Sequence, residues 1–316
     1  MTLVRAPLGC AVREALRGAV AVVGNLDGVH RGHQVLLKAA ADEARRQDAP
    51  LAAVTFEPHP RRAFTPDTPP FLLTTLPQKT DLLRAAGCQT VFALPFGDAL
   101  YQLSPDAFVR DVLAGVLGLR GAVVGEDFRF GAKRAGDAAT LTGLAARAGL
   151  TARIVAVAGG AQKWSSTTAR HALREGRPAD AATVLGRPFA IRGTVIEGRH
   201  LARTMQFPTA NVDLGDYVRP AYGVYAVTAR LPDGTEAGGV ANIGVRPTVD
   251  GETERLEAHL FDWSGDLYGQ EIEVALHAFL RSEMPFDGVE ALRSQIAKDA
   301  AAAREALTKI EPMDGR

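Results

Sequence analysis

Two histidines three residues apart, His30 and His33, are the side chains of this sequence with the clearest capacity for chemistry. They end the segment Gly24-Asn25-Leu26-Asp27-Gly28-Val29-His30-Arg31-Gly32-His33, which lies between an apolar run at 19–23 and an amphipathic run at 34–46. This order predicts a strand, a glycine turn and the start of a helix. Both imidazoles would then stand beside the free N–H groups and the positive end of the helix dipole, a corner suited to phosphate.

A His-x-x-His pair by itself is also typical of a solvated helix start or of a metal site. Glu57 and His59 follow the next apolar run, and with the two histidines they would offer imidazoles and a carboxylate to a metal-dependent hydrolase. Pro58 and the glycine pattern match a phosphate-binding loop better. The hydrolase therefore stays a minor alternative that metal analysis of the purified protein would test.

Length and composition favour a folded protein of two domains. The chain has 316 residues, of which 47% are apolar and 23% are charged. Lys plus Arg and Asp plus Glu number 36 each, so no global basic field exists to hold nucleic acid, and any anion site must be local. The N-terminal apolar stretch is too short for a signal or a membrane span, which predicts a cytoplasmic protein without a membrane partner.

The cysteine content is low. Cys10 and Cys88 are the only cysteines and form no Cys-x-x-Cys pair, which argues against a disulfide framework or a thiolate zinc site. We interpret both as small buried residues.

The chain up to about residue 175 alternates short β-branched runs with helical ones. Strands are predicted at 20–23, 51–56, 90–94, 122–125 and 153–157, and helices at 34–46, 77–86, 105–117 and 138–149. This alternation predicts an α/β domain with a doubly wound parallel sheet. Ligands bind at the carboxyl ends of the strands in such sheets, which is where the histidine turn falls.

The pattern changes near Gly186, so we expect domains at 1–185 and 186–316. Short alternating strands at 191–196, 223–230, 236–243, 257–261 and 271–280 predict a compact antiparallel β-barrel. Residues 285–307 have helical periodicity and predict a C-terminal helix packed on the barrel or at the domain junction.

The histidine segment resembles the His-x-Gly-His signature of the nucleotidyltransferase superfamily, and with its preceding glycines it resembles bacterial bifunctional riboflavin kinase/FAD synthetases. Further matches follow in order at 54–60, 124–131 and 165–170 for the first domain, and at 207–211 and 256–260 for the second. The resemblance covers nearly the full length. It implies an FMN adenylyltransferase domain followed by a riboflavin kinase barrel, with ATP as co-substrate, Mg²⁺ as cofactor, and riboflavin, FMN and FAD as substrates or products.

The resemblance also implies roles for residues of the first domain. His30 and His33 would contact the ATP phosphates, and His33 would stabilise the transition state. The remaining implied positions bind nucleotide or flavin: Gly24, Asp27, Gly28, Gly32, Asp127, Ser165, Ser166, Thr167 and Arg170 for the nucleotide, and Glu57, Pro58, His59 and Phe128 for the flavin. In isolation, the Ser-Ser-Thr run is typical of a helix N-cap, and Phe128 and Phe130 are compatible with core packing.

The kinase domain has three implied site residues. Thr209 and Asn211 would bind Mg-ATP, and Glu257 would be the general base that accepts the proton of the flavin 5′-hydroxyl. In isolation, 208–211 is typical of a turn with an Asx-type bond, and Glu257 of a solvent-facing strand carboxylate.

The phosphate loop of the kinase domain departs from the family pattern. Gly198 and Arg203 fit nucleotide-binding positions, whereas Ala202 and Gln206 stand where the family has glycines. A Cβ at such positions hinders positive φ and close approach of the backbone. A flavin adenylyltransferase with a weak or altered kinase half is therefore the first alternative, and a non-catalytic flavin-binding module is the second. The sequence leaves the oligomeric state open.

Overall fold

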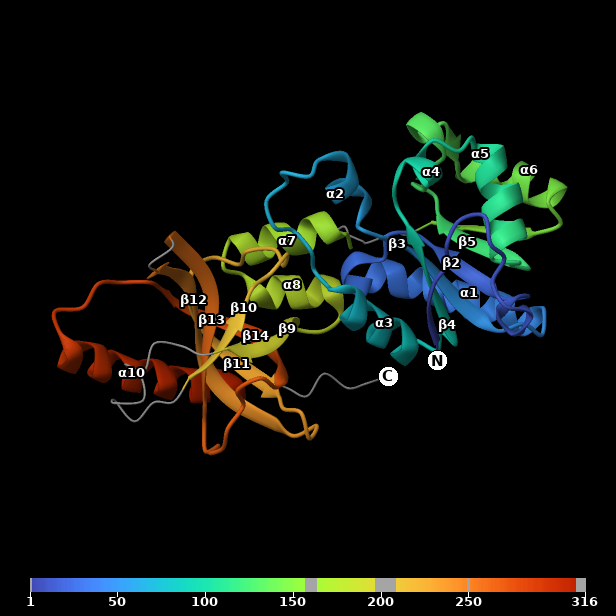
Figure 1. Ribbon diagram of the computed structural model, residues 1–316. Helices are drawn as coiled ribbons and strands as arrows, with labels where there is room; N and C mark the ends of the chain where they lie inside the picture. The colour runs from blue at the N-terminus through green and yellow to red at the C-terminus, as the bar shows by residue number, and fades with distance from the viewer. Residues whose placement is uncertain (1, 157–163, 197–208, 249–250, 311–316) are drawn as a thin grey trace. The chain divides into compact units, whose positions relative to one another are not determined.

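The computed structural model describes residues 2–156, 164–196, 209–248 and 251–310, which form two compact units (Figure 1). Unit 1 contains Met1–Pro69 and Thr74–Trp164, and unit 2 contains Pro70–Leu73 and Ser165–Arg316. By contacts, residues 165–185 therefore belong with the barrel. The boundary at residue 185 stays a prediction for the two family domains.

Unit 1 is built on a parallel sheet with the strand order β1-β4-β3-β2-β5-β8. The strands are β1 (Thr2–Arg5), β2 (Val20–Val23), β3 (Leu51–Glu57), β4 (Thr90–Pro95), β5 (Gly121–Gly125) and β8 (Thr151–Val155). The five predicted strands are confirmed to within two residues at each end. Sequence reasoning missed β1, because this edge strand has only four residues and none of them is buried.

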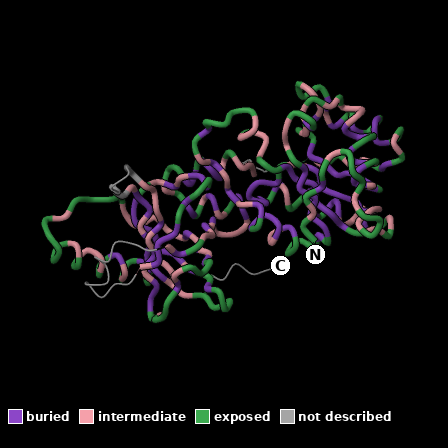
Figure 2. The backbone as a smooth tube through the Cα atoms, in the orientation of Figure 1, coloured by how far each residue is buried: buried purple, intermediate pink, exposed green. Residues whose placement is uncertain are grey.

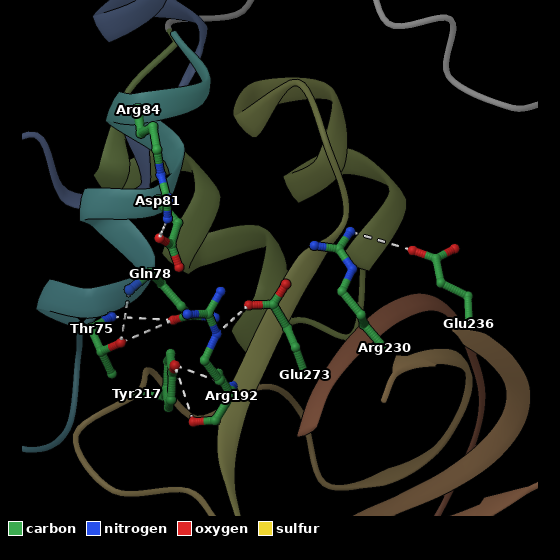
Figure 3. A network of polar contacts seen from close by, with 9 residues as sticks. All are labelled: Thr75, Gln78, Asp81, Arg84, Arg192, Tyr217, Arg230, Glu236 and Glu273. Carbon is green, nitrogen blue, oxygen red and sulfur yellow. Dashed lines mark hydrogen bonds and ion pairs between the residues drawn. The ribbon is translucent and has the colours of Figure 1, made fainter. Parts of the chain in front are cut away.

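The predicted helices of unit 1 are also present. They are α1 (Arg31–Arg46), α3 (Leu76–Ala85) and α6 (Ala138–Arg147), and the run predicted at 105–117 forms α5 (Pro105–Ala107) followed by a π-helix, Phe108–Val116. A capping box between Thr75 and Gln78 starts α3 (Figure 3). Sequence reasoning missed the short helices α2 (Pro60–Phe64) and α4 (Asp98–Tyr101) and the hairpin of β6 (Arg129–Phe130) and β7 (Gly136–Asp137).

Both faces of this sheet are covered, as a doubly wound fold requires. Val20 and Val22 of β2 belong to a buried cluster with residues of α1 and α3, whereas Ala21 and Val23 belong to a second cluster with the π-helix and α6. Because alternate residues of a strand face opposite sides, a strand buried on both sides reads as a continuous apolar run. The predicted α/β class is confirmed.

Unit 2 contains a closed antiparallel barrel with the strand order β10-β13-β12-β11-β14-β9. The strands are β9 (Phe189–Ile196), β10 (Ala210–Asp213), β11 (Gly223–Arg230), β12 (Glu236–Thr248), β13 (Gly251–Leu260) and β14 (Glu271–Ser282). Five of the six were predicted, although β12 and β13 extend beyond the predicted ends. Sequence reasoning missed β10, whose residues overlap the segment that is typical of a turn in isolation.

Helices pack against the barrel at two places. Inward-facing Leu256, Ala258 and Leu260 share a core with Ala169 of α7 (Ser166–Arg174) and Val184 of α8 (Pro178–Leu185). The C-terminal helix α10 (Val289–Thr308) packs on an outer face, where Ala303 joins a cluster with residues of β11 and β12. Figure 2 shows the buried residues of the barrel in purple, whereas most of α10 is exposed or intermediate. The expected packing of the terminal helix on the barrel is confirmed.

An ion pair links two neighbouring barrel strands. Arg192 of β9 and Glu273 of β14 are register partners, and the Arg192 Nε lies 2.9 Å from the Glu273 Oε2 (Figure 3). Opposite charges at directly facing positions favour this register over its one-residue shifts.

The two cysteines lie in different environments. Cys88 is buried, and burial raises the pKa of its thiol to about 12. Cys10 is exposed, so the expectation that both cysteines are buried is wrong for Cys10. Other residues of its segment, Leu8, Val12 and Leu16, pack against the core, but Cys10 does not.

The segment Pro70–Leu73 belongs to unit 2 although unit 1 residues flank it on both sides. The backbone N–H groups of Phe71 and Leu72 donate to the carbonyl of Asp216, and the Leu72 carbonyl accepts from the N–H of Val218. Phe71 and Leu73 are each 1% exposed. This short segment is therefore a structural part of the barrel unit.

We expect Phe71→Ala to lower the free energy of unfolding of unit 2 by about 3–5 kcal/mol, because it removes a fully buried aromatic ring. Calorimetric unfolding of the full chain measures the change. Phe64→Ala is the control, since Phe64 is 61% exposed and its loss should change stability by less than about 1 kcal/mol. Equal effects of the two substitutions would contradict this account of Phe71.

Candidate active sites

The turn between β2 and α1 has a strained backbone. Leu26, Gly28 and Val29 have φ values of 52°, 81° and 41°. Left-handed backbone suits glycine, but it costs about 1–2 kcal/mol at a residue with a side chain, and a β-branched residue such as Val29 tolerates it least. Such a turn persists only where its surroundings hold it, and strain of this kind gathers at functional sites.

The histidines pair closely where the turn meets α1. His30 is the N-cap residue, and its Nδ1 accepts a hydrogen bond of 3.4 Å from the N–H of His33. The two rings stack with centroids 3.6 Å apart and 21° between their planes. Gly32 permits this packing, because a Cβ at position 32 would lie 3.1 Å from the His30 ring and 2.9 Å from the Trp164 carbonyl oxygen. The predicted strand, glycine turn and helix start are confirmed.

The His33 ring holds an open polar atom in buried surroundings. Its Nδ1 is buried and has no hydrogen-bond partner among the residues that the structure describes. Burial lowers the pKa of His33 well below its ordinary value, and the positive charges of His30 and Lys79 lower it further. His33 is therefore a neutral imidazole at neutral pH, with a ring nitrogen ready for a ligand.

Asp27 stabilises the turn from within the protein. Its Oδ1 accepts hydrogen bonds from the Thr74 N–H at 3.0 Å and the Thr74 hydroxyl at 3.2 Å. The same hydroxyl oxygen accepts from the Gly28 N–H at 3.0 Å. Asp27 is only 2% exposed, so these described contacts give its carboxylate a structural function beside the nucleotide-binding one that the sequence predicts.

Lys79 is a site residue that sequence reasoning missed. Its Nζ donates to the Asn25 carbonyl at 2.9 Å and to the Thr55 hydroxyl at 3.2 Å. Burial lowers the pKa of Lys79, whereas the carboxylates of Asp27 and Glu57 act in the opposite direction. The only available signal was a lysine in the amphipathic run of α3, and exposed lysines on such helices are far more common.

Other predicted residues follow the carboxyl ends of β3 and β5. Because parallel strands end at one edge of a sheet, these segments share the edge that carries the histidines. Glu57 is exposed at the end of β3, and the His59 Nδ1 caps α2 by accepting from the Arg61 N–H at 3.1 Å. After β5, Asp127 is exposed, while Phe128 stacks on the buried Phe130 with centroids 5.4 Å apart.

These side chains do not form a metal-hydrolase centre. Within residues 2–156, 164–196, 209–248 and 251–310, no group of three or more His, Cys, Asp or Glu side chains is arranged to hold a metal ion. The side chains at this sheet edge therefore do not fit a metal-dependent hydrolase.

Aromatic rings that sequence reasoning missed gather after β3 and β4. The Phe64 ring lies 5.5 Å from that of Phe96 and 5.1 Å from that of Tyr101, and Phe96 meets Phe56 at 5.7 Å. Phe64 is 61% exposed although it belongs to this cluster. An exposed aromatic face beside a candidate phosphate site is suited to a flat ring system.

The predicted second phosphate cradle lies in unit 2. Ser165 is the N-cap of α7 and accepts from the Thr168 N–H at 3.2 Å, and Ser166 and Thr167 form the first turn. Arg170 is buried, and its Nε donates to the Phe71 carbonyl at 2.7 Å. The structure thus confirms the helix N-cap and gives Arg170 a structural contact within unit 2; nucleotide binding by these residues stays a prediction.

The barrel brings together two of the three predicted kinase residues. Asn211 of β10 is the register partner of Glu257 of β13, and Asn242 of β12 is the partner of Glu257 on its other side. Register partners point to the same face of a sheet, here the face opposite the inward-facing Leu256 and Ala258. The Asn211 amide nitrogen donates to the Thr209 carbonyl at 3.4 Å. Gly198 and Arg203, with Ala202 and Gln206, lie outside the described residues.

The structure thus has two candidate sites, the histidine pair at the N-terminus of α1 and the polar register partners on a barrel face. The FAD synthetase family model matches residues 12–168, and the riboflavin kinase family model matches residues 185–307. The chain belongs to the family of bifunctional riboflavin kinase/FMN adenylyltransferases.

Relatives of that name cover nearly the whole chain. Those from Escherichia coli (strain K12) and Bacillus subtilis (strain 168) are 42% and 35% identical, over 93% and 91% of this chain and 95% and 92% of their own. A crystal structure described as a macrolide-efflux protein from Streptococcus pneumoniae has a TM-score of 0.85 and 27% identity, over 98% of this chain and 100% of that one. In the part of the chain that the structure describes, no helix is long and apolar enough to cross a membrane.

The lowered pKa of His33 makes stability depend on pH. An unfolded His33 takes up a proton near its ordinary pKa of 6.5, whereas the folded one stays neutral to lower pH. The unfolded state therefore binds more protons in this window, and stability must fall as the pH decreases below about 6.5. We expect His33→Gln to flatten this fall in denaturant titrations between pH 7 and pH 5. A folded His33→Gln variant that keeps the slope of the parent would contradict this account of His33.

Proposed function

We propose that this chain carries out two successive reactions: riboflavin and ATP give FMN and ADP, and FMN and a second ATP give FAD and pyrophosphate. The observation that carries the proposal is the stacked His30–His33 pair at the carboxyl end of β2, with the His33 Nδ1 buried and open. The substrates are small molecules that carry the phosphate groups this corner suits. The cytoplasmic location expected from the sequence stays a prediction.

In the adenylylation half, a phosphate oxygen of FMN attacks the α-phosphorus of ATP. The bond from that phosphorus to the bridging oxygen breaks, and pyrophosphate leaves with the electron pair. No covalent enzyme intermediate is needed, so the protein has to align the three groups and stabilise the negative charge on their oxygens. His30 and His33, with the N-terminal N–H groups of α1, supply that stabilisation, and Gly28 and Gly32 allow close approach of the backbone.

The neutral state of His33 suits this task. A charged imidazole in the free enzyme would incur a large desolvation cost, whereas an ATP phosphate beside it favours the protonated form. The positive charge can therefore develop where the negative charge arrives. The exposed ring of Phe64, with Phe96 and Tyr101 behind it, offers a stacking face for the flavin together with Phe128, while Glu57, Pro58 and His59 line the same strand ends.

We expect His33→Ala to lower FMN adenylylation by about 10² to 10³, the range for losing one preorganised donor to a developing oxyanion. Riboflavin phosphorylation should stay nearly unchanged, because Glu257 and Asn211 serve that reaction. Chromatography of FMN and FAD after separate half-reactions measures both rates. Equal loss of both activities in a folded variant would exclude two independent sites.

In the kinase half, Glu257 accepts the proton of the riboflavin 5′-hydroxyl while the hydroxyl oxygen attacks the γ-phosphorus of ATP. The bond from that phosphorus to the bridging oxygen breaks, and ADP leaves with the electron pair. The strand holds Glu257 rigidly between Asn211 and Asn242, and proton transfer requires such positioning. A hydroxyl, an amide oxygen and a carboxylate are oxygen donors that fit Mg²⁺. Thr209 and Asn211 would hold the ion, which would neutralise charge on the ATP phosphates. Nucleotide binding by Gly198 and Arg203 stays a prediction from the sequence.

We expect Glu257→Gln to remove most kinase activity and to leave the conversion of supplied FMN to FAD intact, because the amide keeps the shape but cannot accept the proton. Asn242→Ala is the comparison variant, since it changes the neighbouring position without removing the base. A Glu257→Gln enzyme that makes FMN at the parent rate would show that this carboxylate is only a surface group. A slow parent kinase with rapid FAD formation would instead favour the specialised adenylyltransferase.

A further inference from the structure

Lys79 lies beneath the histidine turn with its charge buried. The side chain is only 3% exposed, and its Nζ donates to the Asn25 carbonyl and to the Thr55 hydroxyl. The Thr55 hydroxyl itself donates to the same carbonyl at 2.9 Å. Two donors from α3 and β3 thus converge on one backbone oxygen of the segment that leads to His30 and His33.

A buried ammonium group is expensive, which makes its presence informative. Removing such a charge from water costs several kcal/mol unless hydrogen bonds and nearby carboxylates compensate. Two hydrogen bonds and the fields of Asp27 and Glu57 do so here. A methionine would fill a similar volume without this cost, so packing alone gives no reason for a lysine at this position.

We propose that Lys79 is a positioning residue for adenylyl transfer: it fixes the Asn25 carbonyl and with it the strained turn, and it supplies a positive charge beneath the histidine pair. This inference rests on the proposed function of the first domain. Lys79 acts through Asn25, Thr55 and His33 and not by contact with the reacting atoms. It therefore adds a residue of α3 to a site otherwise built from strand ends and the start of α1.

The charge of Lys79 acts on His33 across the packed elements. The charged or titratable groups facing this region are His30 at the start of α1, Asp27 in the turn, Glu57 at the end of β3 and Lys79 on α3. Lys79 and His30 both lower the pKa of His33, whereas Asp27 and Glu57 act on Lys79. Loss of the lysine charge must therefore raise the pH at which His33 takes up a proton.

The test compares Lys79→Met with Lys79→Arg and with Lys38→Met, a control at an exposed position of α1. We expect Lys79→Met to lower the kcat of FMN adenylylation on the order of tenfold to a hundredfold through misplacement of the turn. His33 should then titrate at higher pH in histidine NMR spectra of the free enzyme. Lys79→Arg should keep the titration of the parent, and Lys38→Met should change neither quantity.

Thr55→Val separates the two parts of the inference and serves if Lys79→Met fails to fold. It removes one donor to Asn25 but keeps the lysine charge, so kcat should fall while the His33 titration stays at its parent pH. Calorimetric unfolding of the same preparations reports whether each variant is folded, because Thr55 and Lys79 lie in unit 1 and the kinase residues in unit 2.

A folded Lys79→Met enzyme with a parent-like kcat, or with an unchanged His33 titration, would overturn the role of Lys79. If Lys79→Met does not fold, a parent-like kcat in Thr55→Val would overturn the positioning role. If the parent itself forms no FAD from FMN, the proposed function fails instead, and the titration still tests the electrostatic part.

Discussion

The first active site depends on a strained turn that other parts of the unit must hold in place. Leu26 and Val29 keep left-handed backbone that costs each of them about 1–2 kcal/mol, and they do so because the turn is bonded from two sides. Asp27 and Thr74 hold the Gly28 end, and Lys79 and Thr55 hold the Asn25 carbonyl. The turn also sets the direction of α1 and the stacking of His30 on His33. Each of these buried polar groups therefore orients the backbone of the turn.

The two units reach rigidity by different means. In unit 1, site residues lie on connections after parallel strands, so buried polar contacts must fix each connection. In unit 2, Asn211 and Glu257 lie within the barrel ladder, where backbone hydrogen bonds and register fix their mutual position. A substitution beneath the turn is therefore expected to lower activity more than it lowers the stability of the fold. A change of register in the barrel would disturb both together.

One short segment contributes to both units along the chain. Phe71 and Leu73 are buried in the barrel unit, and the next residue, Thr74, bonds to Asp27 and Gly28 beneath the histidine turn. Arg170, which the sequence suggests as a phosphate ligand, holds the Phe71 carbonyl. Between Leu73 and Thr74 the chain therefore passes from a buried segment of unit 2 to a polar contact of unit 1.

The sequence by itself determined the fold class of each unit and the strand, turn and helix at the histidine pair. It also determined that Glu257 and Leu256 point to opposite faces of their strand. Local periodicity and turn chemistry encode all of these features. Tertiary structure decided which residues meet. No local pattern could show that Lys79 is buried against Asn25, that Asn242 flanks Glu257, that Phe64 joins an exposed aromatic cluster, or that Arg170 bonds to Phe71. Sequence reasoning also missed the strands β1 and β10, because such short segments become strands only when they pair with neighbouring strands. Contacts between residues far apart in the sequence form only when the chain packs, and local periodicity carries no signal for them.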